Sequence, residues 1–96
     1  MKRFVLTPAL REAASRCLWF KSPEEAVDFP EQLAAHIMTY GGTADIDALH
    51  EQLDFDGIRN ALDNAPAGVF DARSWAYWNV KVGRYDTPPM PVRRFE

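Results

Sequence analysis

SWAYWNV, residues 74–80, places two tryptophans and a tyrosine within four positions of a 96-residue chain. Successive residues of a helix are about 100° apart, so this stretch has two apolar sides. A helix that is apolar nearly all round lies either at the centre of its bundle or against another chain. The side of Tyr77 and Val80 is open to both interpretations. The opposite side is predicted to be core, and it carries Trp75, Trp78 and Val82.

Outward from this stretch, helical spacing dominates and no run alternates as a strand would. Ser, Thr and Asp residues that precede apolar runs mark helix starts. The first helix is predicted to run to about Lys21, and the helix from Pro30 is expected to stop where the glycines at 41–42 turn left-handed. The predicted capping residues are Thr7, Ser22, Thr43, Asp54 and Asp71.

These signals predict an all-α fold, a single small bundle of four to five short helices over residues 1–83. An extended proline-rich tail is expected over residues 84–96. Helical spacing also places Tyr40 on the inward face with Leu33 and Ile37. Phe55 is predicted to point inward in the same way.

Composition indicates one globular domain. Apolar residues make up 47% of the chain and charged residues 26%, which is ordinary for a folded protein. The single cysteine, Cys17, excludes an internal disulfide and favours a reducing compartment. The N-terminal apolar run is too short for a signal peptide, and no stretch approaches the ~20 apolar residues of a membrane span. The sequence therefore predicts a soluble, cytoplasmic protein.

The charges are unevenly distributed, although the net charge is only −3. Residues 1–21 carry five basic side chains and one acidic one, while residues 22–42 carry four acids and no base. Residues 43–63 add six acids against one arginine, and residues 64–96 are basic again. Either the basic ends pack beside the acidic middle, or the polarised surface steers a charged partner.

The sequence offers little support for catalysis, a metal or a cofactor. Cys17 lies on an inward helical stripe, which favours a buried structural thiol over a nucleophile. Asp47, His50 and Asp54 follow i, i+3, i+7 spacing and could share one side of a helix. A solvated acidic face explains this trio better than a metal site, and His36 and His50 are each interpreted as a partly buried or surface histidine rather than a ligand. No catalytic constellation, cofactor or metal site is predicted.

Nucleic-acid binding has one weak signal. Residues 43–53 and 55–65 have the proportions of a helix–turn–helix, but this region is strongly acidic and a recognition helix needs basic side chains. DNA reading by this pair is therefore disfavoured. The alternative is a regulator that touches phosphates through its basic N-terminal segment, which contains Lys2, Arg3, Arg11, Arg16 and Lys21.

The tail contains a PxxPxR pattern over residues 88–93, which favours polyproline II geometry. The pattern is short and arises often by chance. Docking of the tail on its own domain, or on a partner, is more consistent with the sequence than an SH3 ligand. Met90 and Phe95 are the predicted anchors.

Several short motifs occur in an order that is informative: Leu18-Trp19-Phe20, Ile37, Met38, Tyr40-Gly41, Asp45-Ile46, Leu49, Ser74-Trp75, Trp78-Asn79 and Gly83. This order resembles a family of small bacterial proteins encoded beside AbiEii-type nucleotidyltransferase toxins and presumed to act as antitoxins. The resemblance covers about residues 18–84, and it excludes the proline-rich tail and the long N-terminal helix. It implies a protein that acts by binding a toxin.

The leading hypothesis is a protein-interaction module, not an enzyme, and most specifically an antitoxin-like partner of a nucleotidyltransferase toxin. The acidic helices between Asp45 and Asp56 are expected to face a basic cleft of that toxin. A homo-oligomeric structural module, which would bury Tyr77 and Val80 in a homodimer, is the other alternative to nucleic-acid binding. The predicted partner-binding residues are Trp19, Phe20, Tyr77, Val80, Lys81, Met90 and Phe95.

Overall fold

The computed structural model describes residues 1–91, and in that range it contains six α-helices and no strand. The all-α prediction is confirmed. The count exceeds the four to five predicted helices because the capped turn after Ser22 forms a short helix of its own. The helices are α1 (Pro8–Cys17), α2 (Pro23–Ala26), α3 (Pro30–Tyr40), α4 (Thr43–His50), α5 (Phe55–Asp63) and α6 (Ala72–Lys81).

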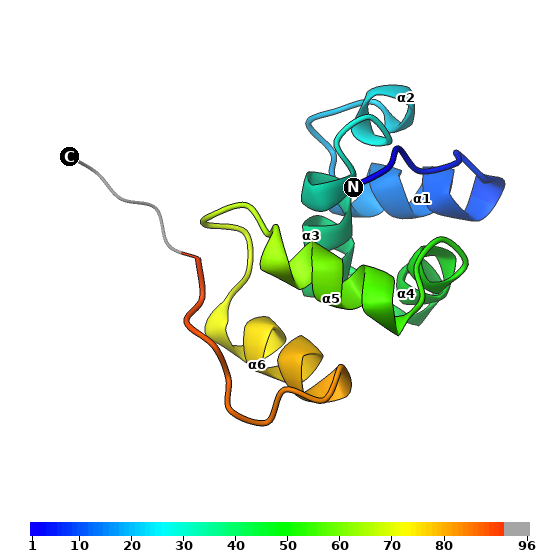
Figure 1. The fold of residues 1–96 in the computed structure, drawn as a ribbon. Coiled ribbons are helices and arrows are strands. Elements are labelled where there is room, and N and C mark those ends of the chain that lie inside the picture. The colour runs from blue at the N-terminus through cyan, green and yellow to red at the C-terminus, as the bar shows by residue number, and fades with distance from the viewer. Residues whose placement is uncertain (92–96) are drawn as a thin grey trace.

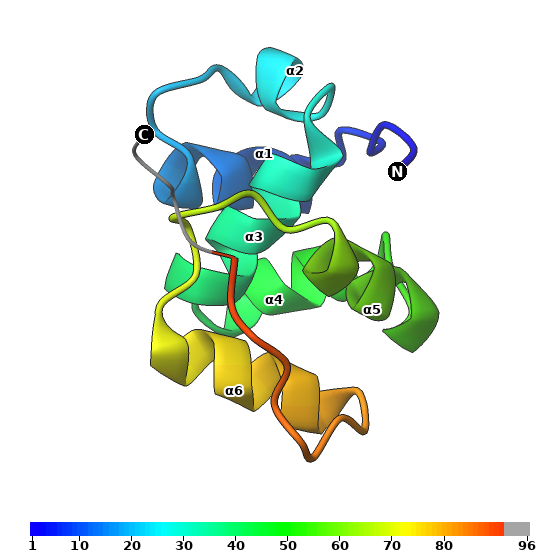
Figure 2. The same ribbon diagram turned by 60° about the vertical axis from the view of Figure 1, so that its left-hand side comes forward.

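The central element is α3, which contacts every other helix (Figure 1). Its sequence suits this position because the small residues Ala34 and Ala35 are buried and let neighbouring backbones approach closely. Leu33 and Ile37 are completely buried beside them. The helix that carries SWAYWNV is not central, since α6 packs on α3 at one side of the bundle (Figures 1 and 2).

Four predicted caps are confirmed by their hydrogen bonds. Thr7 accepts from the Leu10 N–H at 3.1 Å, and Ser22, Asp54 and Asp71 cap α2, α5 and α6 in the same way. Each bond satisfies a donor that the first turn of a helix leaves unpaired. The prediction for Thr43 is wrong by one position: Gly42 precedes α4 and Thr43 is its first residue.

Gly41 ends α3 for a reason other than the predicted one. Its φ is −75°, so it does not adopt the left-handed conformation. A Cβ at this position would lie 2.5 Å from the Ile37 carbonyl oxygen and 2.9 Å from the Asp45 Cβ. Glycine is therefore required because the chain turns too tightly from α3 into α4 to accommodate a side chain.

The ends of α1 and α6 differ in character. The α1 helix stops at Cys17, four residues before the predicted end, because Leu18 leaves the helical conformation with φ −133° and ψ 64°. The α6 helix ends at a Schellman motif: Gly83 has φ +92°, and the Arg84 N–H donates to the Asn79 carbonyl at 2.8 Å. Gly83 and Gly68, whose φ is +83°, are the left-handed glycines of the described residues.

The core side of α6 is as predicted. Trp75, Trp78 and Val82 are all buried. The Trp78 indole N–H donates to the Met38 carbonyl at 2.8 Å, so the buried ring has its polar atom satisfied and fixes α6 to the end of α3.

Residues 84–91 form no regular element and run back along α6 (Figure 2). The Trp75 indole N–H donates to the Pro88 carbonyl at 2.8 Å, and Met90 packs against the core. This part of the proline-rich segment therefore docks on its own domain, which was one of the two predicted alternatives.

Candidate protein-interaction surface

The outer side of α6 presents apolar surface to solvent. Tyr77 is 55% exposed and Val80 is 47% exposed. The Lys81 ammonium lies 5.8 Å from the centroid of the Tyr77 ring, so a cation flanks the aromatic face. The structure thus separates the two sides of SWAYWNV, with tryptophans inside and Tyr77 and Val80 outside.

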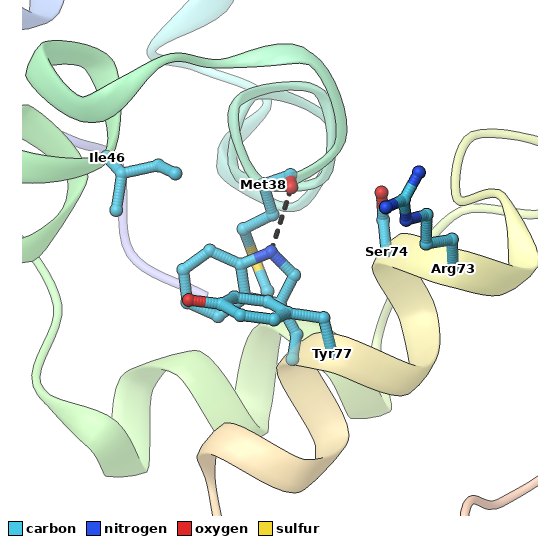
Figure 3. A pocket seen from close by; sticks show the side chains of 6 residues that line it. Met38, Ile46, Arg73, Ser74 and Tyr77 are labelled. Carbon is cyan, nitrogen blue, oxygen red and sulfur yellow. Dashed lines mark hydrogen bonds between the residues drawn. The ribbon is translucent and has the colours of Figure 1, made fainter.

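A shallow pocket opens beside Tyr77, between α3, α4 and α6 (Figure 3). It has a volume of about 250 Å³. The Tyr77 ring stands edge-on to the Trp78 ring at a centroid distance of 5.4 Å, and together they make its aromatic wall. Arg73 and Ser74 lie at one end of the pocket and Ile46 at the other (Figure 3). The lining residues are Met38, Ile46, Arg73, Ser74, Tyr77 and Trp78.

Aromatic surface continues from this pocket along α4. The His50 ring lies 6.1 Å from the Trp78 ring and 6.1 Å from the Phe55 ring. Phe55 is 50% exposed, which contradicts its predicted inward orientation. Phe55 is the first residue of α5. Its side chain therefore lies ahead of the helical turn that contacts the core.

A second exposed aromatic cluster lies where α1 ends beside α3. The Phe20 ring is 5.8 Å from the Trp19 ring and 5.5 Å from the His36 ring, and Tyr40 continues the series at 5.9 Å from His36. Trp19 is 76% exposed and Phe20 is 53% exposed. His36 is buried, and its Nδ1 lies 2.9 Å from the Gln32 carbonyl oxygen, so it supports the exposed rings.

Tyr40 is a surface residue that sequence spacing assigned to the core. It is 61% exposed and shares a face of α3 with His36 rather than with Leu33 and Ile37. The i, i+4 spacing of His36 and Tyr40 was the sequence signal for this shared face. It indicates an exposed cluster only when Phe20 is known to lie beside His36.

The seven predicted partner-binding residues do not form one site. Tyr77, Val80 and Lys81 share the outer side of α6, while Trp19 and Phe20 belong to the cluster on α3. Tyr40 was not predicted to join that cluster. Met90 is partly buried against the domain's own core, and Phe95 lies outside the described residues.

Most of the basic N-terminal segment is engaged within the chain. Arg3 pairs with Asp28, Arg11 with Glu24, and Arg16 with Asp45. The Lys21 ammonium donates to Gln32 at 2.7 Å and lies 3.5 Å from the centroid of the Phe29 ring. Arg84 similarly pairs with Asp63 at 2.8 Å. These contacts confirm that the basic ends pack beside the acidic middle.

Cys17 has the environment of a structural thiol. It is 2% exposed, and burial together with the nearby Asp45 carboxylate raises its pKa to about 11. A nucleophilic cysteine needs a lowered pKa and access to substrate. Its environment therefore agrees with the predicted structural role.

The spacing of Asp47, His50 and Asp54 does not produce a metal site. Within residues 1–91, no group of three or more His, Cys, Asp or Glu side chains is arranged to hold a metal ion. Asp54 instead accepts a hydrogen bond from the Gly57 N–H at 2.8 Å, and His50 contacts two aromatic rings.

No protein-family model, curated protein or solved structure matches this chain. Among the helices of residues 1–91, none has the length and apolar character that crossing a membrane requires.

Proposed function

We propose that this chain is a protein-interaction module that acts by binding, as an antitoxin-like partner that neutralises a nucleotidyltransferase toxin. The exposed aromatic surface is the observation that carries the binding role. Trp19, Phe20, Tyr77 and Val80 each keep about half or more of their side-chain surface in solvent. Large apolar groups gathered in patches on a small domain mark interaction sites, and aromatic residues are enriched there.

The assignment of the partner rests on the ordered motifs of residues 18–84. Two of those motifs include residues of the exposed clusters. Trp19-Phe20 forms one end of the α3 cluster, and Tyr40 forms the other. An antitoxin needs no chemistry of its own, which is consistent with the structural role of Cys17.

Nucleic-acid binding through the N-terminal segment is a weaker alternative. Three of its arginines are paired with carboxylates, and Lys21 is held by Gln32 and Phe29. Phosphate binding would have to break these contacts before it gained from counterion release.

Co-expression with the product of the adjacent gene, which the proposal predicts to be a nucleotidyltransferase toxin, tests the proposal. We expect the two proteins to co-purify, and we expect growth inhibition by the toxin to be relieved. Trp19→Ser combined with Tyr77→Ser should weaken both effects. Tyr85→Ser is the matched control, because Tyr85 is 80% exposed and belongs to neither cluster. If the proteins separate and growth inhibition persists, the antitoxin role is wrong.

A further inference from the structure

The pocket beside Tyr77 has the size and lining of a receptor for one side chain. Its volume, about 250 Å³, is below the ~300–1,000 Å³ of sites that enclose a small-molecule ligand. The side chains of Met38 and Ile46 and the rings of Tyr77 and Trp78 provide apolar walls, while Arg73, Ser74 and the Tyr77 hydroxyl add polar groups. An apolar side chain from a protein segment fits this site better than a cofactor does.

The charges beside the pocket differ at its two ends. Asp47 follows Ile46 directly, and Glu51 lies one helical turn further along. Both are exposed, and neither forms an ion pair with any other described residue. Seven acids form ion pairs within the described residues, whereas Asp47 and Glu51 do not, so the negative charge of these two is available to a partner.

The opposite end of the pocket is positive. Arg73 is exposed on the first turn of α6, and in the described part of the chain no carboxylate pairs with it. Figure 3 shows Arg73 and Ile46 on opposite sides of the Tyr77 ring. Lys81 lies further along α6 and does not line the pocket. The pocket is therefore apolar in the middle and basic toward the start of α6, and the exposed acids Asp47 and Glu51 lie beyond its Ile46 end without lining it.

We propose that this pocket binds a protein segment that inserts one apolar side chain between Ile46 and Tyr77. The segment places lysine or arginine over Asp47 and Glu51 and a carboxylate toward Arg73. Charge complementarity thus sets both the class of partner and its direction across the site. This inference rests on the proposed function, namely that the chain acts by binding a protein, and it names which surface does so.

A library of random 12-residue peptides displayed on phage tests this directly with the purified protein. We expect the enriched peptides to share one large apolar residue flanked by Lys or Arg on one side and by Asp or Glu on the other. Their affinity should fall about tenfold or more for Tyr77→Ser and for Asp47→Lys, and it should weaken as salt is raised. Arg73→Glu should favour peptides of the opposite charge order.

Two variants serve as matched controls. Tyr85→Ser removes an exposed tyrosine from the tail, and Glu25→Lys reverses an exposed acid on α2. Both should bind the selected peptides within about twofold of the original chain, and circular dichroism should show all variants folded. The inference is wrong if no peptide is enriched over an unrelated protein, or if Asp47→Lys and Glu25→Lys behave alike. It is also wrong if Tyr77→Ser abolishes a homodimer in sedimentation, since a second copy would then be the occupant.

The outcome is separable from that of the toxin experiment. If peptides are selected but the toxin does not bind, the pocket assignment is supported and the proposed partner is wrong. Toxin binding that survives Tyr77→Ser and Asp47→Lys but is lost in Trp19→Ser would support the proposed function and overturn the pocket assignment.

Discussion

Asp45 is the residue on which three parts of the chain converge. Its carboxylate accepts from the Arg16 Nε at 2.9 Å and from the Gly42 N–H at 3.1 Å, and the Cys17 Sγ lies 3.8 Å away. The hydrogen bond from Arg16 is the largest influence that lowers the pKa of Asp45 below its ordinary value. This buried charge joins α1 to α4 and holds the tight turn after α3.

Asp45→Asn should lower the free energy of unfolding by about 1–3 kcal/mol at pH 7, because it removes a charge-assisted bond from a buried site. The Asp45 pKa is lower in the folded state, so its contribution is present above the unfolded pKa near 3.8 and is lost as pH falls through the folded pKa. Urea unfolding should therefore show a difference that shrinks below about pH 4. Asp28→Asn, at an exposed pair, should change stability by less than about 1 kcal/mol.

Cys17 gives the opposite pH dependence. Its pKa rises from 9.0 to about 11 on folding, so the contribution of the neutral thiol is complete below pH 9 and is lost as pH rises toward 11. The original chain should become less stable over this window, and Cys17→Ala should lose less over the same window despite its lower stability at neutral pH. Parallel decline of both proteins would show that the buried thiol does not titrate in this way.

At the scale of the elements, local chemistry was predictable and contacts between segments were not. Thr7, Ser22, Asp54 and Asp71 cap helices through bonds to residues three positions away, so sequence alone reveals them. Helical periodicity identified the core side of α6, but it left open whether Tyr77 and Val80 would be buried or exposed. The grouping of Tyr40 with Phe20, twenty positions away, is made through the His36 ring, and no local pattern encodes it.

A substitution at Gly41 tests whether a contact between segments, rather than local helix chemistry, determines the residue at this turn. Gly41→Ala should destabilise the fold by about 1–3 kcal/mol, because its Cβ would meet backbone and side-chain atoms that have little room to move. Gly42→Ala is a close control, since a Cβ there would meet nothing within 4 Å. Chemical denaturation should show a cost below about 1 kcal/mol for Gly42→Ala. Equal costs would mean that helix capping, rather than close packing, requires the glycine at 41.

For the molecule as a whole, ion pairs and apolar contacts bind both ends of the chain to its middle. The N-terminal segment is joined by exposed and individually weak pairs such as Arg3–Asp28 and Arg11–Glu24, and by the burial of Phe4 in the core. The C-terminal segment is held by the Arg84–Asp63 pair, by one indole hydrogen bond and by the apolar contact of Met90. This leaves α6 covered on its Trp75 side by the tail and open on its Tyr77 side.

Trp75→Phe isolates the contribution of the indole bond to that arrangement. Phenylalanine keeps an aromatic ring in the core but cannot donate to the Pro88 carbonyl, so the tail should open more often while the helices remain packed. We expect trypsin to cleave after Arg84 several-fold faster in the variant, measured by mass spectrometry under native conditions. Cleavage after Arg16, within α1, is the internal control and should change little, because it requires opening of the bundle itself. If both sites become equally sensitive, Trp75 stabilises the whole fold and the tail has no separate opening.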